Sequence, residues 1–249
     1  MSKERFENVY KEWTDDIHEW GFDNHWYNYR PFNDEYWNEK NKIVICNSES
    51  GDCMEEREQV LDMTMIRKWM NENKDYKRPN PTILFSMVLA SALHKTLDSG
   101  KILSEVELKK LKEDRSSLYK GLSRCMYMNL RREANDRRKL DEIAVRKFLD
   151  PHYYSVTNKN NVDIQHFKDM VDALEPTVFI ITGKVGYSVL YNMYNYDHED
   201  LKKNKQELQL DWLGACKYKN TVFASIKHPS MFEYRKCMSW IEKIFAGLR

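Results

Sequence analysis

The chain has 249 residues, of which 41% are hydrophobic and 13% aromatic, so it can bury a core and is not a disordered chain. Its 40 Lys and Arg nearly balance 39 Asp and Glu. This balance excludes nucleic-acid binding driven by overall charge, and a DNA contact would require a local basic face. No apolar run approaches the ~18 residues of a membrane helix, and the charged N-terminus lacks the apolar region of a secretory signal. We therefore expect no membrane association and a cytoplasmic location.

The number of cysteines is odd, and none of them form a C-x-x-C pair: Cys46, Cys53, Cys125, Cys216 and Cys237. This spacing argues against a disulfide framework and against a four-cysteine zinc or iron–sulfur site. Cys46 and Cys125 lie in or beside apolar runs, where cysteine acts as a small buried hydrophobe. We expect a reducing environment, no metal and no cofactor.

Hydrophobic periodicity predicts helices that alternate with short apolar strands along the chain. The first predicted helix shows the pattern of an amphipathic helix, because its apolar residues recur at spacings of 3 and 4. The predicted helices are 3–20, 54–73, 82–98, 105–119, 163–175, 185–194 and 231–247, and the predicted strands are 42–46, 122–130, 177–182 and 221–226. This alternation predicts an α/β fold with a mostly parallel sheet.

Loops just past the carboxyl ends of parallel strands carry the working residues of such folds. The first loop, NSESGD at 47–52, contains Glu49 and Asp52, either of which could act as a general base or stabilise a cation. A polar turn in which Ser48 or Ser50 caps the next helix is the alternative. In the second loop, the Asn129 amide can donate and accept in parallel, which suits a base edge, although a simple turn residue would look the same.

The third strand-end loop is KHPS at 227–230. A histidine held between a strand and Pro229 can donate to a developing anion, and Ser230 can cap the next helix or hold a phosphate oxygen. A half-buried structural role for His228 is the alternative. The sequence contains no nucleotide-phosphate motif, no G-x-S-x-G elbow and no zinc-protease or zinc-deaminase motif.

Taken in order, these segments resemble the uracil-DNA glycosylase superfamily. The resemblance rests on KIVICNSESGD (42–52), RCMYMNL (124–130), FKDMVDALEPTVFIITGKVGYSVL (167–190) and TVFASIKHPSMFEYRK (221–236). It implies a three-layer α/β/α domain over 1–249 with a central, mostly parallel four-stranded sheet. It also implies a monomeric, monofunctional glycosylase that flips a base out of DNA and hydrolyses its glycosidic bond, in repair or phage defence, without a metal or cofactor.

By resemblance, Glu49 takes the catalytic acidic position and His228 the catalytic histidine, while Asn129 reads the base and Ser230 contacts a phosphate. The chain departs from the family around Glu49 itself. Asn47 replaces the usual glycine, Ser50 the usual proline, and Glu49 the usual Asp or Asn. These departures leave open a relative that has lost its activity.

Gly51 occupies the position where uracil-strict members place a bulky tyrosine that excludes a 5-methyl group. We therefore expect a substrate broader than uracil, such as a 5-modified or damaged pyrimidine. The remaining predicted substrate contacts are Asn47, Ser48, Ser50, Asp52, Phe32 and Tyr36. The predicted DNA contacts are Lys227, Pro229, Ser230, Arg235, Gly183, Lys184, Arg131 and Arg132, although the arginine pair also fits a solvated helix face.

Two segments have no motif of the family. The aromatic-rich N-terminal segment, 1–41, is best interpreted as a lid packed over the sheet, with base stacking as the alternative. Residues 54–120 leave room for an inserted helical subdomain. Besides the glycosylase, two functions stay open: a non-catalytic DNA- or protein-binding relative, and an unrelated α/β enzyme acting on a small nucleotide or sugar.

Overall fold

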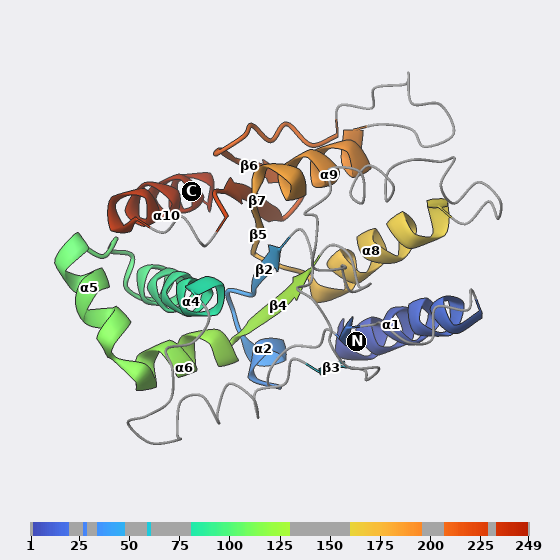
Figure 1. Cartoon of the computed structure of the whole chain (residues 1–249), viewed down its shortest axis with the longest axis horizontal. Coiled ribbons are helices and arrows are strands. Elements are labelled where there is room, and N and C mark those ends of the chain that lie inside the picture. The colour runs from blue at the N-terminus through green and yellow to red at the C-terminus, as the bar shows by residue number, and fades with distance from the viewer. Residues whose placement is uncertain are drawn as a thin grey trace.

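The computed structural model describes residues 2–19, 27–28, 34–47, 59–60, 81–129, 160–195, 207–228 and 233–248. A five-stranded sheet of spatial order β4-β2-β5-β7-β6 forms the centre (Figure 1). Its strands are β2 (Ile43–Asn47), β4 (Cys125–Asn129), β5 (Val178–Thr182), β6 (Ala215–Tyr218) and β7 (Thr221–Ile226). The first four strands of the spatial order pair in parallel, and β6 pairs antiparallel with β7.

Alternation along each strand divides the core between the two faces of the sheet. In β2, Val44 and Cys46 pack on one face, whereas Ile43 and Ile45 pack on the other. All of these side chains are fully buried, which explains why parallel strands covered on both faces appear as continuous apolar runs. Burial of each such side chain contributes about 1.5–3 kcal/mol to stability.

Helices cover both faces and complete the three-layer α/β/α fold that we expected (Figure 1). The first layer contains α1 (Ser2–Glu19), α2 (Glu35–Asn38), α8 (Asn160–Leu174) and α9 (Lys184–Asn195). The second contains α4 (Pro81–Ser99), α5 (Glu105–Glu113), α6 (Arg115–Ser123) and α10 (Tyr234–Leu248). Two short strands, β1 (Tyr27–Asn28) and β3 (Gln59–Val60), form a separate parallel pair. Of the described helices that begin within 54–120, α4 and α6 contact this sheet, and α5 packs against α4, α6 and α10.

Three differences from the sequence prediction go beyond small shifts of element ends. The predicted helix at 105–119 is two helices, because the Asp114 side chain accepts from the Ser117 N–H and starts α6 anew. The predicted strand at 122–130 begins only at Cys125, after α6 ends. The edge strand β6 was not predicted at all. It forms a hairpin with β7, in which Lys219 adopts a φ of 53°.

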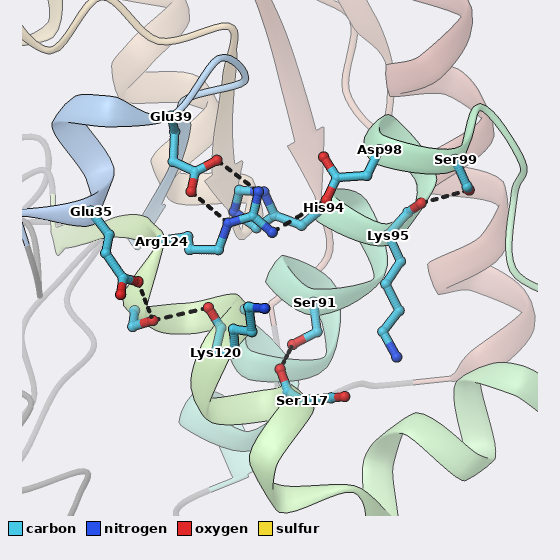
Figure 2. A network of polar contacts seen from close by, with 12 residues as sticks. Glu35, Glu39, Ser91, His94, Lys95, Asp98, Ser99, Ser117, Lys120 and Arg124 are labelled. Carbon is cyan, nitrogen blue, oxygen red and sulfur yellow. Dashed lines mark hydrogen bonds and ion pairs between the residues drawn. The ribbon is translucent and has the colours of Figure 1, made fainter.

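A polar network fastens β4 to the surrounding helices at the edge of the sheet opposite the carboxyl ends (Figure 2). Arg124 donates two hydrogen bonds to Glu39, at 2.6 and 2.7 Å, and a third to Asp98 at 3.3 Å. Beneath it, His94 Nε2 lies 3.4 Å from the Cys125 sulfur, and both side chains are buried. This cluster joins α2, α4 and β4 without reaching the strand ends where we expected the site.

None of the described helices combines the length and apolar content needed to cross a bilayer.

Candidate functional site

The parallel register gathers the predicted strand-end residues along one edge. Asn47 at the end of β2 lies opposite Asn129 at the end of β4. On the other side of β2, β5 ends at Thr182, which is paired with Ile226 of β7, and His228 follows two residues later. Because β2 lies between the strands that follow it in the chain, the point where β2 meets β5 is a topological switch point, where ligands bind in open α/β sheets.

Asn47 is a buried residue at this switch point. It is only 5% exposed. Its side-chain oxygen accepts from the Thr182 hydroxyl at 2.7 Å, and its amide donates to the Tyr127 hydroxyl at 2.5 Å. We predicted Asn47 as a substrate contact, but these bonds direct its side chain to neighbouring strands. Asn47 therefore positions the edge of the sheet.

Tyr127 extends this network toward α4. Its side chain is buried, and the Ser86 side chain on α4 is a further hydrogen-bond partner. Burial raises the pKa of the Tyr127 phenol to about 12, so the hydroxyl keeps its proton at neutral pH. The network therefore carries no charge, and its buried polar groups satisfy one another.

Gly183 makes the turn from β5 into α9. Its φ of 80° lies in the left-handed region, which a side chain disfavours. The Gly183 N–H donates to the Ile226 carbonyl at 2.9 Å, and the Gly183 carbonyl accepts from the Tyr187 N–H at 3.0 Å. The first bond fixes the turn beside the end of β7. Lys184 then begins α9 as an exposed cation at the same edge.

His228 follows β7 at an accessible position. Partial loss of solvent around the ring lowers the pKa of His228 below its ordinary value of 6.5. The imidazole is therefore largely neutral at pH 7, with one nitrogen that donates and one that accepts. A neutral donor of this kind can stabilise an anion that forms during a reaction. Lys227, half-buried, precedes it and adds a positive charge to this edge.

Arg235, a predicted DNA contact, lies in the first turn of α10. Its side chain is 89% exposed, and its Nε lies 3.4 Å from the Glu105 carboxylate at the start of α5. This carboxylate is shared with Lys109, and hydrogen bonds from the two cations lower the pKa of Glu105. The exposed guanidinium is accessible to a ligand, but part of its charge is offset by Glu105.

Tyr36 does not lie at this edge. It is completely buried in the layer that contains α1 and α8, and its hydroxyl donates to the Leu174 carbonyl at 3.0 Å. Leu174 ends α8 just before β5 begins, so Tyr36 lies near the amino ends of the strands. The prediction that Tyr36 contacts a substrate is therefore wrong. Its ring packs edge-on against Trp37 at 5.2 Å, in agreement with the packing interpretation of this residue.

Several predicted site residues lie outside the described residues: Phe32, Ser48, Glu49, Ser50, Gly51, Asp52, Arg131, Arg132, Pro229 and Ser230. For Asn129 the backbone is described and ends β4, whereas its side chain is not. The assignments of these residues stay predictions.

Two residues of the edge were missed by the sequence analysis. Thr182 is the last residue of the apolar run TVFIIT, and Tyr127 is the only ring in the β4 segment CMYMN. The signal for both residues was a polar side chain on the same face of the sheet as Asn47, in the strand next to β2. The signal could not be used without knowing that β4 and β5 both lie beside β2.

Within the described part of the chain, no group of three His, Cys, Asp or Glu side chains could hold a metal ion. Cys46, Cys125 and Cys237 are buried free thiols, and burial raises the pKa of each. A protonated thiol in an apolar site is a poor nucleophile and a poor metal ligand.

Comparison of the sequence with protein-family models finds no match, and comparison with curated proteins finds none either.

Proposed function

We propose that this protein is a DNA glycosylase, which flips a pyrimidine out of DNA and hydrolyses its N-glycosidic bond to leave an abasic site. The observation that carries the proposal is the register of the sheet. Asn129, His228 and the start of the Glu49 segment come from three strand ends along one edge, in the arrangement that the family resemblance requires. The accessible position of His228 adds support, because the imidazole carries an N–H donor in either protonation state.

Cleavage of the glycosidic bond builds positive charge on the sugar and negative charge on the departing base. The Glu49 carboxylate would stabilise the sugar cation and orient the attacking water. His228 would donate a hydrogen bond to the base oxygen on which the negative charge develops. Each such preorganised contact can lower the barrier by about 3–4 kcal/mol.

Asn129 would select the base, because an amide can donate and accept side by side along a pyrimidine edge. Gly51 would leave space beside the 5-position, so the substrate would include uracil and larger 5-substituted pyrimidines. Lys184 and Lys227 follow the neighbouring ends of β5 and β7, and they would contact the phosphates on either side of the flipped nucleotide. Cytoplasmic location, monomeric state and a role in repair or phage defence stay predictions.

A non-catalytic DNA-binding relative is the second candidate, and one observation favours it. Asn47 occupies the position of the family's glycine, and its side chain is buried and bonded to Thr182 and Tyr127. The residue that leads into the Glu49 segment is thus tied to the sheet by side-chain bonds that a glycine could not make. Such a protein would keep the fold and the phosphate contacts without cleaving a bond.

The experiment is an excision assay with end-labelled oligonucleotides that carry uracil, a thymine mismatch or a 5-substituted cytosine, followed by alkaline cleavage. We expect alkali-labile sites with the wild type and none with Glu49→Gln or His228→Ala. His166→Ala is the matched control, because this half-buried histidine lies on α8 with its ring stacked against Trp13 of α1. Salt-dependent binding without excision would favour the non-catalytic relative. The absence of both DNA binding and excision would refute both candidates.

A further inference from the structure

A row of three aromatic rings lies where α9 meets the segment that runs beside it, close to the site edge. Tyr187 lies in the middle, with its ring centroid 5.9 Å from that of Tyr191 and 5.6 Å from that of Trp212. All three side chains are half-buried, so each packs on one side and is accessible on another. Such rings offer faces on which planar groups can stack.

The row is held in place at its middle and at its Trp212 end. The Tyr187 hydroxyl donates to the Leu210 carbonyl at 3.0 Å, which fastens its ring to the segment that runs beside α9. The turn that carries Trp212 is held by Ser225, whose hydroxyl accepts from the Leu213 N–H at 2.7 Å and donates to the Asp211 carbonyl at 2.9 Å. A ligand would therefore meet preorganised rings, which reduces the entropy lost on binding.

A cavity of about 440 Å³ lies between α9 and this segment. Its volume falls within the range of small-ligand pockets, roughly 300–1,000 Å³. Residues of α9 line one side, and residues of the neighbouring segment line the other: Tyr187, Tyr191, Leu208, Gln209, Leu210 and Asp211. Asp211 repels a phosphate and can accept from an N–H group. The cavity thus favours the base of a nucleotide over its phosphate.

The charges around the row complement a nucleic-acid backbone at the site edge. Lys184 lies three residues before Tyr187, on the same side of α9, and is exposed. Lys227 follows β7, whose Ile226 carbonyl is bonded to Gly183 at the base of α9. Cations at the edge and rings along the helix follow the pattern of single-strand binding sites, in which the backbone is neutralised and bases stack.

We propose that Tyr191, Tyr187 and Trp212 form a stacking site for an unpaired base of the DNA strand, adjacent to the catalytic edge. This stacking site rests on the proposed glycosylase function, and it specifies the class of DNA that the glycosylase would act on. The protein would prefer single-stranded or locally opened DNA over an intact duplex. Stacking requires an unstacked neighbouring base, which a duplex supplies only at the expense of unpairing.

The test measures binding by fluorescence anisotropy with a labelled thymidine single strand, the same strand built from abasic units, and a matched duplex. We expect the thymidine strand to bind more tightly than the other two. Trp212→Ala and Tyr191→Ala should each weaken binding of the thymidine strand by roughly 5- to 150-fold, and binding of the abasic strand should not change. Trp212→Phe and Tyr191→Phe keep a ring and should restore most of the affinity.

Tyr218→Ala is the matched control, since this half-buried tyrosine lies at the hairpin end of β6, near the opposite edge of the sheet. It should bind the thymidine strand like the wild type. Equal losses on thymidine and abasic strands, no loss in either alanine variant, or a preference for duplex would overturn the stacking site. Stacking without excision would keep this site and refute the proposed glycosylase, whereas excision without base-dependent binding would do the reverse.

Discussion

Thr182 and Asn47 join the ends of β5 and β2 at the topological switch point of the sheet. The Thr182 hydroxyl donates to the Asn47 side-chain oxygen at 2.7 Å, across 135 residues of sequence. Asn47 then donates to Tyr127 on the other neighbouring strand, so one buried side chain ties β5 to β4 through β2. The Glu49 segment begins at this fixed position. The bond thus links the packing of the sheet to the proposed chemistry.

Asn47→Ala should destabilise the protein by about 1–3 kcal/mol, because it removes the partner of the buried Thr182 hydroxyl and one of the two partners of the Tyr127 hydroxyl. The expected change is a lower urea midpoint with an unchanged slope, followed by circular dichroism. Thr182→Val removes the hydroxyl that Asn47→Ala would leave without this partner. The double variant Asn47→Ala/Thr182→Val should therefore be more stable than the sum of the two single changes implies. Strict additivity would mean that the bond contributes nothing.

Arg124→Ala should destabilise the protein by about 1.5–3 kcal/mol through the loss of its paired hydrogen bonds to Glu39 (Figure 2). Asp98→Asn is the matched control on the same guanidinium. Its carboxylate is 54% exposed, against 16% for Glu39, so its loss should change stability by less than about 1 kcal/mol. Thermal unfolding of the variants measures both. An Asp98→Asn effect as large as that of Arg124→Ala would contradict this ranking.

His94 should make stability fall on acidification. Its side chain is 2% exposed, and burial, followed by the charge of Arg124, lowers the pKa of His94 from 6.5 to about 4. The nearby Glu39 and Asp98 raise it only in part. The unfolded chain therefore binds a proton between pH 6.5 and 4 that the folded chain does not. Stability is full above pH 6.5 and decreases by about 3 kcal/mol as the pH approaches 4.

The measurement compares urea unfolding at pH 7 and pH 4.5 for the wild type and His94→Phe. The variant lacks the titrating ring, so it should lose less stability over this interval, although other groups of the chain still titrate. His228→Ala is the control, because the pKa of His228 is also lowered but its ring is accessible. If His94→Phe lost as much stability as the wild type, the acid sensitivity would belong to other groups.

Most of the sheet could be predicted because β2, β5 and β7 are apolar runs buried on both faces. The strand β6 could not, since its ACKY segment is an edge strand with no fully buried side chain and no apolar run. The split at Asp114 was missed because the periodicity continues through it, whereas its local hydrogen bond to Ser117 starts a second helix. The local hydrogen bond, and not the hydrophobic periodicity, therefore sets this helix boundary.

The site was predictable only as far as strand order allows. The carboxyl ends of the strands place His228 and Asn129 at one edge, and this follows from the α/β pattern alone. The positions of Asn47 and Tyr36 depend on contacts across the chain. Tyr36 is bonded to a carbonyl 138 residues away, and nothing in an aromatic-rich segment indicates which ring is buried at which edge.

His228 should act as a neutral donor, and its pH profile tests this. Because partial desolvation lowers the pKa of His228 below 6.5, most rings are neutral at pH 6.5 and nearly all are neutral at pH 8. The single-turnover rate of excision should therefore rise by less than about twofold from pH 6.5 to 8, and His228→Ala should lower it by about 10²- to 10³-fold at every pH in this interval. A cationic His228 would instead give a wild-type rate that falls with rising pH, about tenfold per unit, and this result would exclude the neutral donor.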